Sequence, residues 1–184
     1  MSDRRTPLLI LGLGNVLLED DGVGSAAVRV LLDRYIPPAD VQVFDGGTLG
    51  LSLLPYVDAA DAVILVDAVK ADAAPGTCVR LEGEDVAPAV ATRLSPHQIG
   101  VADLLDGARW LERSPRTLTL LGIVPASMEL AVGLTPRVHA SLLDLVGEIV
   151  GTARELGFVF RPRLPHEMAA DTCAADVARL AGMP

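Results

Sequence analysis

LLILGLGNVLLEDDGVG, residues Leu8–Gly24, opens with an apolar run up to Leu11 and continues through glycines to two adjacent carboxylates, Asp20 and Asp21. An apolar run followed by glycines is typical of a buried strand that leaves its sheet through a tight turn. Helical periodicity begins near Val23. In an open parallel sheet the loop after such a strand lies at the carboxyl edge, where ligands usually bind. The stretch therefore predicts an α/β sheet with acidic side chains at its ligand-binding edge.

The rest of the chain continues this alternation of strands and helices. We expect strands at residues 8–13, 41–44, 62–66, 77–81 and 117–124, and helices at 23–35, 49–57, 95–112 and 135–156. Residues 83–94 give no clear pattern. The alternation predicts a three-layer α/β/α fold, with a mostly parallel twisted sheet of about five strands and helices on both faces. We expect residues 1–163 to form this single domain, and 164–184 to be a tail that is either a short helix or disordered.

The composition narrows the class of protein. Hydrophobic residues make up 51% of the 184 residues but aromatic residues only 3%, so the core has to be built from Leu, Val, Ile and Ala. The formal net charge of −9 argues against binding to nucleic acid or insertion at an anionic membrane. No stretch approaches the roughly 20 apolar residues of a membrane-spanning helix. The two cysteines are far apart and form no CxxC pair, which favours a reduced protein of the cytoplasm.

Four acidic residues and one histidine fall at the ends of predicted elements. Asp20 and Asp21 follow the first strand, Asp45 ends the second, and Asp67 ends the third. His97 lies in the first turn of a helix that starts with a capping box. The carboxyl ends of parallel strands meet at one edge, so we expect all four carboxylates there, with His97 beside them if its helix starts at that edge. Carboxylates and an imidazole suit a borderline divalent cation such as nickel or zinc.

Each of these residues also has a purely structural interpretation. Asp21 could cap the first helix, and Asp45 before two glycines could form an Asx turn. His97 could be a solvated residue of a first helical turn. Asp67 is harder to explain structurally, because a charge that ends a fully apolar strand needs a partner or water.

A nucleotide site is the main rival interpretation. Gly12 and Gly14 after the first strand, with Asp45 after the second, imitate the dinucleotide-binding fingerprint. However, Leu17 stands at the third glycine position, and two aspartates lie where a pyrophosphate would sit. Like charges at that point argue against phosphate binding.

Six short motifs, in this order, give the sequence a resemblance to the maturation endopeptidases of nickel-iron hydrogenases. The resemblance covers residues 8–157, and it is the ordered set rather than any one motif that is specific. The motifs are Gly12-Leu13-Gly14-Asn15 with Leu17, Asp20, Asp21, Gly22 and Gly24; Asp45-Gly46-Gly47-Thr48; Asp67-Ala68; Ser95-Pro96-His97-Gln98-Ile99-Gly100; Leu121-Gly122-Ile123 through Pro125; and Gly133-Leu134-Thr135-Pro136.

The resemblance implies a specific activity. Such enzymes remove a C-terminal extension from the hydrogenase large-subunit precursor after its metal centre is loaded. The family's metal-contacting residues correspond to Asp21, Asp67 and His97, and Asp45 is the candidate catalytic residue. The resemblance further implies that the metal is nickel carried by the substrate, whereas zinc or cadmium could occupy the site in vitro. Asp20 matches a motif position without a clear role, and the segment after Arg163 matches nothing in the family.

The sequence thus predicts a cytoplasmic peptidase whose partner is the large-subunit precursor. Two alternatives stay open. One is a nucleotide-binding oxidoreductase, and the other is a metal-dependent docking chaperone that binds the large subunit at the same acidic site without cutting it.

Overall fold

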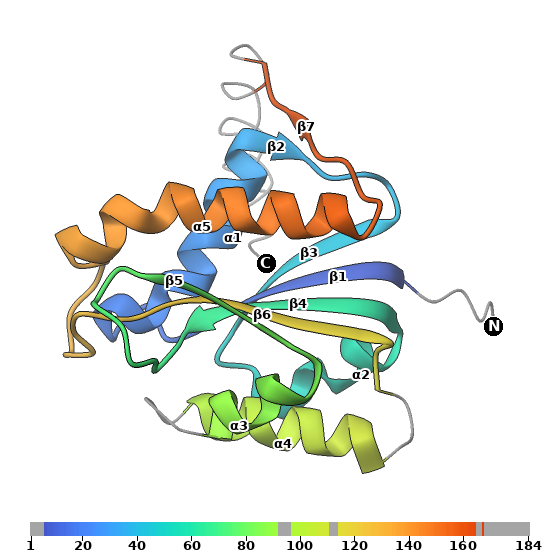
Figure 1. Cartoon of the computed structure of the whole chain (residues 1–184), viewed down its shortest axis with the longest axis horizontal. Helices are drawn as coiled ribbons and strands as arrows, with labels where there is room; N and C mark the ends of the chain where they lie inside the picture. Colours follow the sequence, from blue (N-terminus) through green and yellow to red (C-terminus); the bar gives the residue numbers. More distant parts are fainter. Residues whose placement is uncertain (1–5, 92–96, 111–113, 165–166, 168–184) are drawn as a thin grey trace, which may run out of the picture.

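The computed structural model describes residues 6–91, 97–110, 114–164 and 167, and it shows the predicted three-layer fold (Figure 1). The main sheet contains β1 (Thr6–Leu13), β3 (Val41–Gly47), β4 (Ala60–Ala68), β5 (Cys78–Glu82) and β6 (Thr117–Ile123). The strand order is β3-β1-β4-β6-β5, with β5 antiparallel to β6 and the other pairs parallel. The helices are α1 (Val23–Arg34), α2 (Leu54–Asp58), α3 (Val86–Ala91), α4 (His97–Trp110) and α5 (Pro136–Glu155), with the 3₁₀ turns η1 (Glu19–Gly22), η2 (Gly50–Leu53) and η3 (Gly83–Asp85).

The helices form two layers that enclose the sheet. Helices α1 and α5 cover one face, and α2, α3 and α4 cover the other (Figure 1). Along β1, Leu8 and Ile10 pack into the core cluster under α1 and α5, whereas Leu9 and Leu11 pack into the cluster under the other helices. All four side chains are buried. This explains why the strand is a continuous apolar run, because it has no face in water.

Two strands continue further than their sequences predict. The strand predicted at residues 41–44 continues to Gly47, so no turn begins at Asp45. The β1–β3 ladder runs through Gly12↔Asp45 and, after a register shift, to Leu13↔Gly47. Likewise β4 continues to Ala68. Neighbouring strands supply backbone partners at these positions, and those bonds outweigh the turn preference of glycine. Both aspartates therefore lie in strands rather than after them.

Other segments differ from the sequence prediction in smaller ways. The unassigned segment 83–94 contains η3 and α3 within its described part. A second, two-stranded sheet pairs β2 (Tyr35–Ile36) with β7 (Arg161–Pro162), and strands of two residues are too short to show a pattern. The predicted tail, residues 164–184, falls almost entirely outside the described residues. Ser95 and Pro96, which begin the predicted capping box before His97, also lie outside them. No helix in the described part of the chain is long and apolar enough to cross a membrane.

Candidate active site

Asp21 lies in η1, directly above the carboxyl edge of the sheet. Its side chain is fully buried, and one carboxylate oxygen accepts a hydrogen bond of 2.9 Å from the backbone N–H of Asn15. The N-cap of α1 is Gly22, and no side chain caps this helix. The interpretation of Asp21 as a helix cap is therefore wrong.

Asp67 lies near the end of β4 and is 2% exposed. Its neighbours Val66 and Ala68 both pack under α1 and α5. Since side chains alternate along a strand, Asp67 points to the opposite face, which α2, α3 and α4 cover. One of its oxygens accepts a 2.8 Å hydrogen bond from the N–H of Ala68.

Close packing at Gly24 brings the segments of Asp21 and Asp67 together. A Cβ atom at Gly24 would lie 2.1 Å from the carbonyl oxygen of Val66 and 2.3 Å from that of Leu13. Only a residue without a side chain lets the first turn of α1 lie this close to the ends of β1 and β4. Asp21 and Asp67 consequently belong to segments that meet at one junction of the fold.

His97 is the first residue of α4, and the backbone places it at the same edge. A Cβ atom at Gly100, one turn further along, would lie 2.8 Å from the Cα atom of Gly50. Gly50 begins η2, just after the carboxyl end of β3. Helix α4 thus starts at the carboxyl edge, on the face toward which Asp67 points. The His97 side chain lies outside the described structure, and among the described side chains no three His, Cys, Asp or Glu residues gather into a metal site.

Asp45 occupies the other face of the sheet. The hydroxyl of Ser25 on α1 donates a 2.6 Å hydrogen bond to its carboxylate, and the guanidinium of Arg29 lies 3.9 Å from the second oxygen. Its side chain is 46% exposed. Ser25 and Arg29 are not among the residues predicted from the sequence, although their spacing of four residues places them on one face of a helix.

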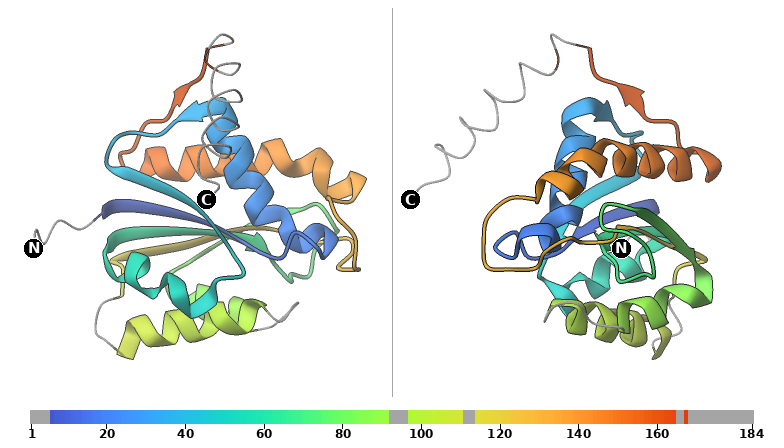
Figure 2. Two further views of the ribbon diagram at one scale, coloured as in Figure 1. Left: turned by 180° about the vertical axis from the view of Figure 1, so that it is seen from behind. Right: turned by 60° about the vertical axis from the view of Figure 1, so that its left-hand side comes forward.

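Asp20, for which the sequence indicated no clear role, has a structural one. Its fully buried carboxylate accepts hydrogen bonds from the N–H groups of Ala126 (2.8 Å), Ser127 (3.1 Å) and Thr135 (2.8 Å), and from the Thr135 hydroxyl (2.9 Å). Asp20 lies at the predicted edge, because the segment between β6 and α5 that it binds follows the carboxyl end of β6, but its oxygens are taken up by that segment. That segment lies beside the start of α1 (Figure 2).

The same geometry argues against a nucleotide site. Helix α1 begins only after η1, so the glycines that follow β1 do not lead directly into its N-terminus. Asp20 and Asp21 are both buried at that point. An anionic phosphate would meet two carboxylates there instead of free backbone N–H groups.

Comparisons with known proteins give the same family as the sequence motifs. The model of the hydrogenase maturation protease family matches residues 26–152. The chain is 40% identical over 157 residues to the hydrogenase 2 maturation protease of Escherichia coli (strain K12), an alignment that covers 85% of this chain and 96% of that protein. It is 38% identical over 153 residues to the hydrogenase expression/formation protein HupD of Rhodobacter capsulatus, an alignment that covers 82% of this chain and 72% of that protein.

Solved structures that resemble this one belong to the same family. The hydrogenase maturating endopeptidase HybD from E. coli superposes with a TM-score of 0.81 at 40% identity, covering 85% of this chain and 98% of that one. The [NiFe] hydrogenase maturation protease HybD from Thermococcus kodakarensis gives a TM-score of 0.65 at 27% identity, and the match covers 80% of this chain and 99% of that one. The five-stranded, mostly parallel sheet with helices on both faces is the fold they share. The chain belongs to the hydrogenase maturation protease family, and it is an endopeptidase.

Proposed function

We propose that this endopeptidase removes the C-terminal extension of a nickel-iron hydrogenase large-subunit precursor after nickel has been inserted. The observation that carries the proposal is the junction at the carboxyl edge, where the buried carboxylates of Asp21 and Asp67 come from segments in direct contact. The first turn of α4, which begins at His97, lies at the same edge. Two carboxylates and an imidazole form a donor set that suits nickel.

Nickel comes with the substrate rather than residing in the protease. A dedicated zinc site usually has three protein ligands that are rich in imidazole and oriented by further hydrogen bonds. Asp21, Asp67 and His97 offer one imidazole and two carboxylates, which hold an isolated cation weakly. Zinc or cadmium, supplied at high concentration, would occupy the same three donors in vitro.

This arrangement couples cutting to completed metal insertion. The nickel ion held by the precursor gives Asp21, Asp67 and His97 something to bind, and the scissile peptide is positioned as a consequence. The ion can also act as a Lewis acid that polarises the peptide carbonyl or a water molecule. An empty precursor lacks this anchor, and we expect it to remain uncut.

Asp45 is the candidate for proton transfer in this proposal. Its exposed carboxylate lies at the carboxyl edge, and the Ser25 hydroxyl holds one of its oxygens at 2.6 Å. A carboxylate fixed in this way can accept a proton from an attacking water molecule. The reaction would take place in the cytoplasm, where reducing conditions keep thiols such as the free Cys78 from forming disulfides.

The test is to incubate nickel-loaded and nickel-free precursor with the purified protein and to measure the mass of the large subunit. We expect the loaded precursor to lose a C-terminal fragment and the empty one to stay intact. A docking chaperone would bind the loaded precursor without shortening it, and that result would overturn the proposal.

A further inference from the structure

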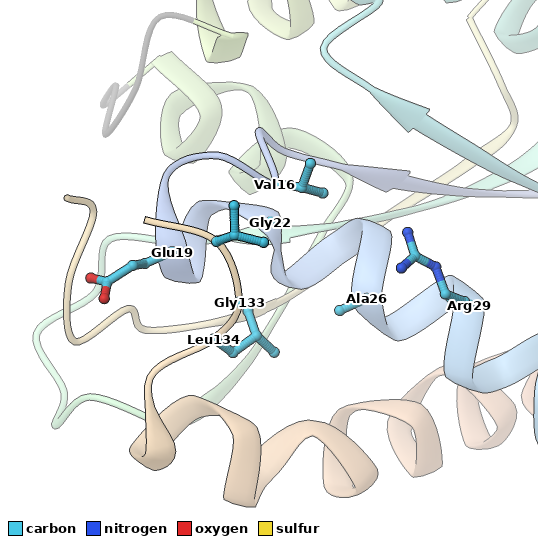
Figure 3. Close-up of a pocket in the computed structure, with 8 residues that line it drawn as sticks. Val16, Glu19, Gly22, Ala26, Arg29, Gly133 and Leu134 are labelled. Atoms are coloured by element: carbon cyan, nitrogen blue, oxygen red, sulfur yellow. The ribbon is translucent and has the colours of Figure 1, made fainter. Parts of the chain in front are cut away.

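A pocket of about 140 Å³ opens between the start of α1 and the segment that precedes α5 (Figure 3). Val16, Ala26, Val132 and Leu134 give it an apolar lining. Glu19 lies at one end and Arg29 at the other (Figure 3). Neither the fold nor the proposed metal contacts require such a pocket.

The backbone at the acidic end is held in an uncommon conformation. Glu19 has a φ of 44°, and it is the non-glycine residue with positive φ in the described part of the chain. Its N–H donates a 2.9 Å hydrogen bond to the carbonyl of Ala131, and Leu18 forms a β-bridge with the same residue. Such strained positions cluster at functional sites, because surrounding structure must hold them in place. The segment that Asp20 binds therefore also fixes the wall of the pocket.

Each end of the pocket is connected to a candidate active-site residue. Glu19 precedes Asp21 by two residues within η1. Arg29 lies 3.9 Å from the carboxylate of Asp45. A chain that crosses the pocket therefore runs from the η1 turn that carries Asp21 to the side chain that faces Asp45.

Exposed apolar side chains lie on the two segments that border the pocket, and two of them, Val16 and Val132, line it. Val16 is 45% exposed, Leu17 53%, Leu130 83% and Val132 81%. A group of exposed apolar residues beside a polar site is typical of a surface that binds another protein. An apolar rim would also fit a second copy of this chain, but the two oppositely charged ends favour a peptide.

The geometry points to a subsite that binds an extended segment of the precursor next to its cleavage point, an inference that rests on the proposed function. An apolar side chain of the segment fills the space above Ala26, and a cationic side chain beside it faces Glu19. We infer the positive charge of the bound segment from charge complementarity. Arg29, at the other end of the pocket, already faces Asp45, whereas no ion pair holds Glu19 within the described residues. With this subsite, the protease selects its precursor by amino-acid sequence as well as by the bound metal.

The test compares binding and cleavage of nickel-loaded precursor by variants of the full-length protein. In Ala26→Leu a larger side chain fills the pocket, and we expect KM and the dissociation constant to rise about tenfold while kcat changes less than about twofold. Ala140→Leu makes the same change at an exposed position of α5 and serves as the matched control. Glu19→Gln keeps the size of the side chain, and its effect on KM should disappear at high salt.

Val132→Ser keeps the test valid if Ala26→Leu proves unstable, because Val132 is exposed and its loss cannot empty the core. Unchanged KM and dissociation constant in Ala26→Leu and Val132→Ser, both folded, would overturn the subsite. A concentration-dependent dimer that Val132→Ser disrupts would overturn it in favour of a second copy. If the wild type binds precursor but never cuts it, the proposed function fails while the dissociation constants still decide the subsite.

Discussion

At the scale of single residues, two adjacent carboxylates have different tasks. Asp20 and Asp21 are both fully buried in η1. Asp20 binds the segment between Ala126 and Thr135, whereas Asp21 lies where η1 meets β4. A one-residue step along a 3₁₀ turn rotates the side chain by about 120°, which separates the two directions.

Asp20→Asn should lower stability. An amide nitrogen in place of one carboxylate oxygen would face N–H donors, and hydrogen bonds to a charged acceptor would be lost. We expect the free energy of unfolding in urea to fall by about 2–4 kcal/mol. Asp33→Asn, at an exposed position of α1, is the control and should change it by less than about 0.5 kcal/mol. Equal stability of the two variants would mean that the Asp20 hydrogen bonds contribute nothing.

Asp67→Asn should abolish cleavage without unfolding the protein. The substitution removes the charge but keeps the volume of the buried side chain, so metal recognition is lost while packing is retained. The measurement is precursor processing together with a urea unfolding curve. Asp61→Asn, at the other end of β4, should process precursor normally. A normal processing rate in Asp67→Asn would show that Asp67 is structural.

At the scale of elements, β4 supports both layers of the molecule. It lies between β1 and β6, and its side chains alternate between the two core clusters, as Ile64 and Leu65 show. Asp67 is thus carried by the most enclosed strand of the sheet. A rigid, buried strand holds a ligand more accurately than a loop would.

Leu65→Ala should act through stability alone. Leu65 is fully buried, and the cavity left by truncation should cost about 2–5 kcal/mol of unfolding free energy. Leu143→Ala, on the exposed side of α5, is the matched control with little expected effect. Precursor processing per folded molecule should stay at the wild-type value in both. A specific loss of processing in folded Leu65→Ala would show that Leu65 also positions the site.

At the scale of the whole molecule, the proposed activity depends on two partners that each bring part of a metal site. In the proposed mechanism, the protein would offer donors from η1, β4 and the start of α4, and the precursor would offer a bound ion. Their encounter, rather than a resident metal, would complete the centre.

Metal analysis of the purified protein tests this arrangement. Protein prepared without added metal should contain far less than one ion per chain, and treatment with a chelator, followed by its removal, should leave cleavage of loaded precursor unchanged. One stoichiometric, chelator-resistant ion, or full-rate cleavage of nickel-free precursor, would show that the nickel is not supplied by the substrate.

The sequence alone determined the layers of the fold and the succession of the five main strands along the chain. Apolar runs such as that of β1 and the periodicity of α5 are local signals. The helix expected from residue 135 is present, and the Thr135 hydroxyl caps it by accepting a 3.4 Å hydrogen bond from the N–H of Val138. The ordered motifs also indicated the family that the comparisons show. All of these signals are local, because each depends on residues that are close together in the sequence.

The tertiary structure decided how the acidic residues are divided. Asp20 and its partner Thr135 are 115 positions apart, a separation that no local pattern reveals. Asp45 and Asp67 share the carboxyl edge but lie on opposite faces. Gly12 pairs with Asp45 on one side and with Val66 on the other, so Asp67 stands one residue further along and points the opposite way. The pocket between Glu19 and Arg29 likewise exists only because the segment before α5 folds back over η1. Contacts between distant segments depend on strand register and close packing, and these are properties of the assembled fold.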